Sequence, residues 1–227
     1  MNAQPTAPPG GATPSSSEAT RQRLIEAGLA LFSRHGYDGV TTRSLAARAR
    51  VNQAAIPYHF GGKAGVYLAV ADAICDDLAA RLHPILADAL ADPQPRAALP
   101  GLIARMFRLS QDDPGNRERF AIMSFAQQRP DQAFTRFHER LHRPLIEALV
   151  ILLERTAGPA PDALAAQARA QAVLGLISGF VCARASVAAS LGDGDALGPV
   201  QLTAIETQLG DLVRALVRGW AQPDHDS

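Results

Sequence analysis

The chain has 227 residues, with 22 basic and 22 acidic side chains, and 47% of its residues are hydrophobic but only 5% aromatic. Alanine and leucine are strong helix formers, and no alternating run of β-branched residues between turn signals predicts a strand, so we expect an all-α fold. Cys75 and Cys182 lie far apart in apolar surroundings, which argues against a secreted disulfide framework.

Residues 1–17 carry no charge, contain no apolar block and are rich in Pro, Gly and Ser. This composition predicts a disordered tail rather than a signal peptide. No uncharged apolar run reaches the roughly 18 residues that a membrane span needs. We therefore expect a cytoplasmic protein with no membrane partner.

Charge is unevenly distributed along the chain. Residues 18–63 hold seven basic and three acidic side chains, whereas residues 64–227 hold fifteen basic and nineteen acidic ones. A basic head on an acidic body is typical of a nucleic-acid binder with a separate second function, and chance segregation of charge is the alternative. We predict a head at residues 18–65 and a body at 66–227.

The head contains three predicted helices. Apolar positions at three- and four-residue steps predict a helix over 18–35, stopped by Gly36. Thr41 and Thr42 can cap a second helix over 43–49, and a three-residue turn leads to a third over 53–60, with Asn52 able to cap it. Two short helices joined by so tight a turn describe a helix-turn-helix unit.

The body is predicted to be helical throughout. Its expected helices run from Tyr67 to an end near His83–Pro84, over about 97–111, over about 116–128, from Phe134 to Thr156 with Pro144 inside, over 162–191 and over 199–220.

The last two helices predict a homodimer interface. The first carries a row of small residues that permits close backbone approach, and we call it the small-residue row: Ala168, Ala172, Gly175, Gly179 and Ala183. The second carries apolar residues near a 3.5-residue period, from Leu202 to Trp220. Both patterns also suit a core within one chain, which is the alternative.

The third helix presents an outer face suited to the DNA major groove. Gln53, Ala54, Pro57 and Tyr58 form this face, which is small at its start. Gln53 can read adenine through its amide, and Tyr58 can reach a phosphate or a thymine methyl. Lys63, the only lysine of the chain, falls at the start of the fourth helix, where a compact charge suits a phosphate.

The segment from Thr20 to Tyr67 resembles the tetracycline-repressor (TetR) family of bacterial regulators. The residues that carry the resemblance are Gly36–Tyr37, Thr41–Thr42–Arg43, Leu45–Ala46, Tyr58–His59–Phe60, Lys63 and Tyr67. The resemblance implies phosphate contacts by Thr42, Tyr58, His59 and Lys63, and base contacts by Arg43, Asn52 and Gln53. Pro57 departs from the aromatic residue usual there; because it has no N–H, we expect the helix to be tightened or bent.

The body resembles the CecR-type subgroup of that family around residues 134–145 and 180–192. The resemblance implies a repressor of efflux or drug-sensitivity genes that is released from double-stranded operator DNA by a small molecule. We expect no cofactor. Two-fold symmetry of the dimer would require a pseudo-palindromic operator.

The Phe and Met residues of the body mark a candidate effector pocket. Its candidate lining, where most of these residues gather, is Met106, Phe107, Phe120, Met123, Phe134, Phe137, Leu141 and Phe180, with Arg140, His142 or Arg184 able to orient a polar end of the ligand. For any one of them, an ordinary core position is the alternative.

The segment His138–Glu139–Arg140–Leu141–His142 matches H-E-x-x-H, the zinc-peptidase pattern. Two histidines four apart can hold zinc, with Glu139 as general base. Pro144 and the lack of a third ligand elsewhere argue against a hydrolase. We expect no enzyme and no metal, and keep a zinc-dependent hydrolase and a sensing metal as alternatives.

Overall fold

The computed structural model describes residues 16–111, 113, 115–191 and 197–221, and every regular element in these ranges is a helix. The expectation of an all-α chain is confirmed. The chain divides into two compact units, one up to Val70 and one from Ala71 onward. The division falls inside helix α4 (Lys63–Ala91), a few residues after the boundary expected from the sequence.

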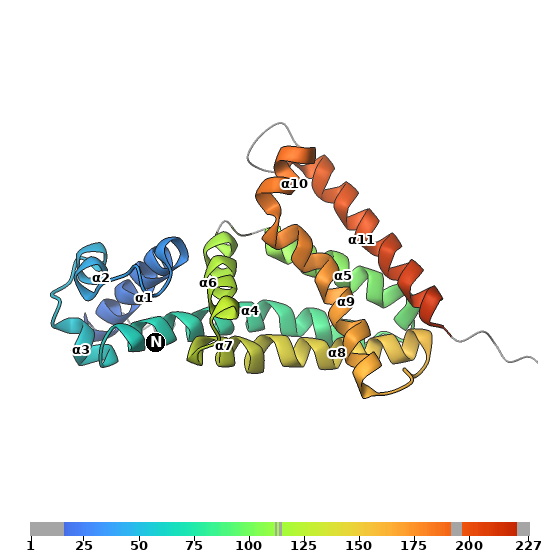
Figure 1. Cartoon of the computed structure of the whole chain (residues 1–227), viewed down its shortest axis with the longest axis horizontal. Helices are drawn as coiled ribbons and strands as arrows, with labels where there is room; N and C mark the ends of the chain where they lie inside the picture. The colour runs from blue at the N-terminus through green and yellow to red at the C-terminus, as the bar shows by residue number, and fades with distance from the viewer. Residues whose placement is uncertain (1–15, 112, 114, 192–196, 222–227) are drawn as a thin grey trace, which may run out of the picture. The chain divides into compact units, whose positions relative to one another are not determined.

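The first unit holds the helices of the head. They are α1 (Ser16–His35), α2 (Thr42–Ala49), α3 (Ala55–Phe60) and the beginning of α4 (Figure 1). Each of the first three helices contributes to a fully buried core, with Leu24 and Phe32 from α1, Leu45 from α2 and Ile56 from α3. The ring of Phe32 meets the ring of Tyr67 edge to face, with centroids 5.0 Å apart.

Local hydrogen bonds set both ends of α2. The Thr41 hydroxyl accepts from the Ser44 N–H (3.0 Å) and the Ser44 hydroxyl accepts from the Thr41 N–H (3.1 Å), which is a capping box. At the other end Arg50 adopts the left-handed conformation, with φ of 54°, and the Val51 N–H donates to the Ala46 carbonyl (3.0 Å). Arg50 thus makes the turn of the helix-turn-helix.

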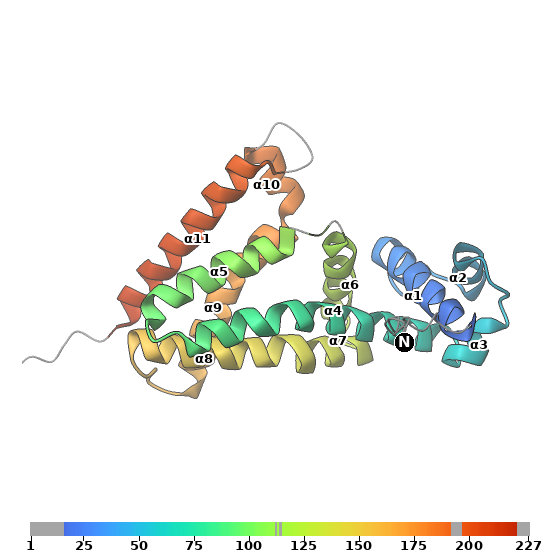
Figure 2. The same ribbon diagram turned by 180° about the vertical axis from the view of Figure 1, so that it is seen from behind.

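The second unit contains the remaining helices. They are α5 (Pro95–Gln111), α6 (Asn116–Gln128), α7 (Gln132–Phe137), the π-helical turn η1 (His138–His142), α8 (Arg143–Ala157), α9 (Ala163–Cys182), α10 (Arg184–Leu191) and α11 (Pro199–Trp220). In Figures 1 and 2, α7, η1 and α8 follow one another along α4. Two arginines join this run to α4: Arg136 donates to Asp72 near one end, and Arg155 donates to the Leu90 carbonyl near the other.

The core of this unit is aliphatic. α4, α5, α8, α9 and α11 supply most of its buried side chains, among them Leu102, Leu149, Leu152 and Leu209. α11 packs on α5, and α8 packs on α9. The low aromatic content of the chain therefore agrees with a core built from helix faces.

Two expected helix limits are wrong. α4 continues through Pro84 to Ala91 instead of ending near His83, and the buried side chains of Leu86 and Ala89 anchor this extension in the core. The expected helix over 162–191 breaks at Ala183, where the backbone leaves the α-helical region, so that α9 and α10 are separate.

The long helix expected from Phe134 to Thr156 is interrupted by η1. Pro144 has no N–H to donate to the Arg140 carbonyl, and the Arg143 N–H bonds instead to the His138 carbonyl, five residues back. The proline therefore accounts for the wider turn directly before it.

α9 leaves much of its surface uncovered. Each member of the small-residue row is exposed, and a Cβ added at Gly175 or Gly179 would meet no atom within 4 Å. Among the described helices, α9 is also the one that is long and apolar enough to cross a membrane. Its most apolar 18-residue stretch has a mean hydropathy of 1.3, and 22% of that stretch is buried. The search of the sequence for an uncharged apolar run did not identify α9, because Arg169 lies inside this helix.

Candidate functional sites: the helix-turn-helix and an apolar cavity

α3 is two residues shorter than expected, and its start explains how Pro57 fits. The Asn52 side-chain carbonyl accepts from the Ala54 N–H (2.9 Å), and the Gln53 carbonyl accepts from the Ile56 N–H (3.1 Å) in a tight turn. Pro57 then lies in the first helical turn, where an N–H has no partner within the helix. The expected tightening is therefore observed before Pro57.

The predicted base-reading face is accessible. Arg43, Asn52 and Gln53 are exposed, and Tyr58 is 83% exposed. The Gln53 amide donates to the Thr42 hydroxyl (3.1 Å), so two predicted DNA contacts hold each other across the turn. If the Gln53 amide bound a base, it would give up this hydrogen bond to Thr42 and form one to the base instead.

Lys63 has an intramolecular partner that the sequence did not reveal. Its Nζ donates to the Tyr37 carbonyl (3.1 Å) and lies 4.1 Å from the centroid of the Tyr37 ring. The ammonium retains further N–H donors for a phosphate. Its position is therefore fixed by the loop after α1.

His59 is half-buried between aromatic neighbours rather than free on the surface. Its ring lies 4.9 Å from the Tyr58 ring, and its backbone carbonyl accepts from Arg21 (3.3 Å). The Arg21 guanidinium in turn lies 4.6 Å from the centroid of the Phe60 ring. Arg21 therefore fastens α1 to the end of α3, a role with no local sequence signal.

The second unit contains a mostly apolar cavity of about 360 Å³, partly open to solvent, between α4, α5, α6, α7, η1, α8 and α9. Seven residues of the predicted effector pocket line it: Met106, Phe120, Met123, Phe134, Phe137, Leu141 and His142. Sequence reasoning missed the walls contributed by α4 and α9, which include Leu78, Leu82, Gln171, Ile177 and Cys182.

Two predicted pocket residues lie elsewhere. Phe107 is fully buried in the core, and its ring meets that of Phe180 edge to face, with centroids 6.0 Å apart. Neither lines the cavity. The side chain of Arg184 is outside the described part of the chain.

Arg140, one of the three residues proposed to orient a ligand, faces α4 and does not line the cavity. It pairs with Asp76 and donates to Asp72 (3.3 Å), and Arg136 donates to the same Asp72 oxygen (2.7 Å). The hydrogen bond to Asp76 raises the pKa of Arg140. Cys75 is buried beside these groups, and burial raises the pKa of its thiol to about 11.

The two histidines of the H-E-x-x-H segment stack on each other. Their ring centroids are 5.2 Å apart, with the ring of Phe134 stacked on the far side of His138 at 5.8 Å. Glu139 is exposed, and no group of three or more potential metal ligands is found among the described residues. The hydrolase interpretation finds no support in this arrangement.

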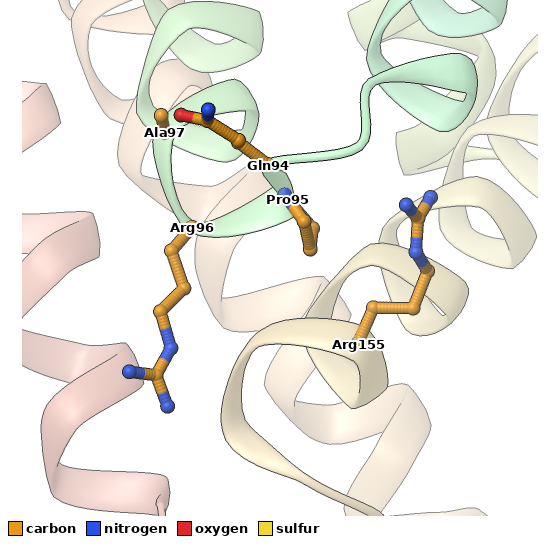
Figure 3. Close-up of a pocket in the computed structure, with 5 residues that line it drawn as sticks. All are labelled: Gln94, Pro95, Arg96, Ala97 and Arg155. Atoms are coloured by element: carbon orange, nitrogen blue, oxygen red, sulfur yellow. The ribbon is translucent and has the colours of Figure 1, made fainter.

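A second concavity, of about 420 Å³ and open to solvent, lies at the start of α5. Its two arginines are committed to backbone carbonyls: Arg155 donates to Leu90 (2.6 Å) and Asp92 (2.7 Å), and Arg96 to Thr156 (3.2 Å). In Figure 3 the two guanidinium groups point in different directions. They brace the connection from α4 to α5 and do not converge on a ligand.

Comparison with known proteins places these sites in a family. Residues 24–70 match the family described as bacterial regulatory proteins, tetR family, and residues 95–220 match the C-terminal domain of the HTH-type transcriptional dual regulator CecR. The CecR protein of Shigella flexneri is 39% identical over 150 residues, which are 62% of this chain and 66% of that protein.

Solved structures share the fold. AibR, in complex with isovaleryl coenzyme A and operator DNA, superposes with a TM-score of 0.64 at 14% identity, covering 86% of this chain and 97% of AibR. The SmeT–triclosan complex gives a TM-score of 0.61 at 19% identity, covering 91% of this chain and 93% of SmeT. The CecR-type match covers more than half of the chain, and this chain belongs to the TetR family of bacterial transcriptional regulators.

Proposed function

We propose that the protein is a homodimeric, cytoplasmic repressor that leaves a pseudo-palindromic operator when a small, largely apolar effector fills the cavity. One observation carries the proposal. α4 begins at Lys63, beside the predicted recognition helix, and the same helix supplies Leu78 and Leu82 to the cavity wall. A ligand that moves α4 therefore acts on an element that also belongs to the head.

Charged pairs strengthen this connection. Asp72 and Asp76 hold α4 to Arg136 of α7 and Arg140 of η1, and these two elements also supply Phe137 and Leu141 to the cavity wall. A displacement of that wall is therefore passed to α4 through both apolar contact and charge. The two heads of a dimer would then no longer reach both half-sites at once.

Thermodynamics fixes what the effector must do. A hundred-fold weakening of operator binding needs about 2.7 kcal/mol of preference for the DNA-free state. Because coupling is reciprocal, operator DNA must weaken effector binding by the same factor. Titration of each candidate effector against free and operator-bound protein tests this directly, and a compound with equal affinity for both is not the inducer.

The dimer interface is proposed on α9, with α11 beside it. The exposed small-residue row gives α9 a flat apolar side, and Leu164 and Leu212 add exposed apolar side chains on α9 and α11. Ile205 and Leu209 of α11 are already buried within the single chain, so we expect α9 to contribute more of the dimer contact than α11. In a dimer, the second copy would cover the exposed apolar residues of α9.

The dimer has a direct test. Replacing Gly175 and Gly179 with leucine places two bulky side chains in the small-residue row and should give monomers in sedimentation. Gly101→Leu is the matched control, because Gly101 is also an exposed helical glycine with open space around it. If the double variant sediments like the control, the interface lies elsewhere.

A role in controlling efflux or drug-sensitivity genes is part of the proposal. SmeT in complex with triclosan has the same fold, which is consistent with an apolar aromatic effector. Gene neighbourhood tests the role: a transporter operon beside the gene supports it, and catabolic enzymes alone argue against it.

A further inference from the structure

The cavity wall is polar in places but carries no fixed charge. None of the described residues that line it is Asp, Glu, Lys or Arg. Its polar members are Ser110, Ser124, Gln127, His138, His142, Gln171 and Ser178. The wall can therefore accept hydrogen-bonding groups but has no permanent counter-ion.

Two arginines that are neighbours in sequence of the wall residues Phe137 and Leu141 are already paired with carboxylates. Arg136 and Arg140 share the carboxylates of Asp72 and Asp76 on the side towards α4. Recruiting Arg140 to a ligand would break its pair with Asp76, and recruiting Arg136 would remove one of the two arginines that hold Asp72. A charged group inside the cavity would thus lose part of its hydration without meeting a permanently charged partner, which is unfavourable.

One polar pair is placed to recognise a ligand. His142 Nε2 lies 3.0 Å from Gln171 Oε1, joining η1 to α9 at the wall, and His142 Nδ1 is buried with no hydrogen-bond partner. The π-helical turn before Pro144 and the stack on His138 fix this imidazole. Whichever ring nitrogen carries the proton, the Gln171 amide retains donor capacity for a ligand.

We propose that this cavity selects uncharged, mostly apolar ligands with a hydroxyl-type hydrogen-bonding group recognised at Gln171 and His142, and rejects carboxylates of the same shape. The inference rests on the proposed role of the cavity as effector site and specifies its ligand class. It also separates this chain from AibR, which binds isovaleryl coenzyme A, because the phosphate groups of a coenzyme A thioester need cations that this wall lacks.

Cys182 provides a readout that needs no DNA. It lines the cavity and is exposed, whereas Cys75 is fully buried with a thiol pKa of about 11. A thiol reagent at pH 8 should therefore modify Cys182 first, and a ligand in the cavity should slow that reaction. Thermal stabilisation by the same ligand supplies a second measure of binding.

The test uses three probes of one shape: 4-butylphenol, 4-butylbenzoate and butylbenzene. We expect 4-butylphenol to protect Cys182 with at least about tenfold higher affinity than 4-butylbenzoate, which corresponds to about 1.4 kcal/mol, because the carboxylate loses hydration and finds no counter-ion in the wall. Gln171→Leu should abolish the preference for 4-butylphenol over butylbenzene while butylbenzene still protects. Gln167→Leu, one turn earlier on α9 and outside the cavity wall, should leave the preference intact.

The outcomes are distinguishable. Equal protection by the phenol and the benzoate overturns the ligand class and leaves the cavity as a binding site. Retention of the phenol preference in Gln171→Leu overturns the recognition pair. Absence of both protection and thermal stabilisation with all three probes overturns the inference together with the cavity's proposed role as effector site.

Discussion

Gly65 is the position where one added methyl group should do the most damage to the head. It lies in the first turn of α4, where the chain turns back immediately after α3 through Gly61 and Gly62, both with positive φ. A Cβ at Gly65 would lie 1.8 Å from the Phe60 carbonyl oxygen and 2.8 Å from its carbonyl carbon. Both atoms are backbone, so no side-chain rotation relieves the clash.

Two opposing terms set the size of the effect of Gly65→Ala. Alanine is favoured over glycine within a helix by about 1 kcal/mol. Overpacking costs about 1–3 kcal/mol, and a rigid backbone neighbour puts this site at the upper end, roughly 3 kcal/mol. The expected net loss is about 2 kcal/mol, and for a chain of this size that lowers Tm by about 4–8 °C.

Thermal unfolding followed by circular dichroism measures the effect against Gly101→Ala. Gly101 is exposed on α5, and a Cβ there would meet nothing within 4 Å, so only the helix propensity changes. We expect Gly101→Ala to raise Tm and Gly65→Ala to lower it. If Gly65→Ala were as stable as the wild type, the close approach of α4 to the end of α3 would be refuted.

Three further predictions concern the turn, the DNA contacts and an acidic group. Arg50→Gly should stabilise the protein by about 1 kcal/mol in thermal unfolding, because glycine adopts the left-handed conformation of Arg50 without strain. Lys63→Ala should weaken binding to all DNA sequences alike and lower the slope of log affinity against log salt concentration by about one. Gln53→Ala should instead relax the preference at one base pair, with a loss of about 1–3 kcal/mol of binding energy for the right base. Similar behaviour of the two variants would contradict these roles. Asp113 has a lowered pKa, chiefly because it accepts a hydrogen bond from the Gly115 N–H, so its stabilisation is present above the unfolded-state pKa and is lost as pH falls through the folded-state pKa. Stability measured from pH 6 down to below about 4 should therefore fall more steeply in the wild type than in Asp113→Asn, and parallel curves would contradict the assignment.

The head could be predicted from sequence because its signals are local. Capping residues, glycine stops and apolar spacing lie within a few positions of what they determine, as at Thr41 and Gly36. The partner of Lys63 could not be predicted in this way. Tyr37 is 26 residues away, and only the folded head brings its carbonyl and ring to the ammonium.

The cavity was predicted only in part, for a comparable reason. Phe134 and Phe137 are conspicuous among aliphatic neighbours, but Leu78 and Ile177 carry no mark that separates a cavity wall from a core. Arg140 is only one of three candidates for orienting a ligand at the level of sequence, because sequence cannot tell which side of the helix faces α4. Its carboxylate partners, Asp72 and Asp76, lie more than 60 residues away.

Selection of binding sites from a random DNA library with the purified protein tests the central claim most directly. We expect enrichment of one pseudo-palindrome, with half-sites about one helical turn or a multiple of it apart, as two symmetrically related recognition helices require. The same experiment with Gln53→Ala should return that palindrome with one symmetric pair of positions relaxed. Enrichment of no sequence, or of an unrepeated single site, would contradict a dimeric repressor that reads DNA through α3.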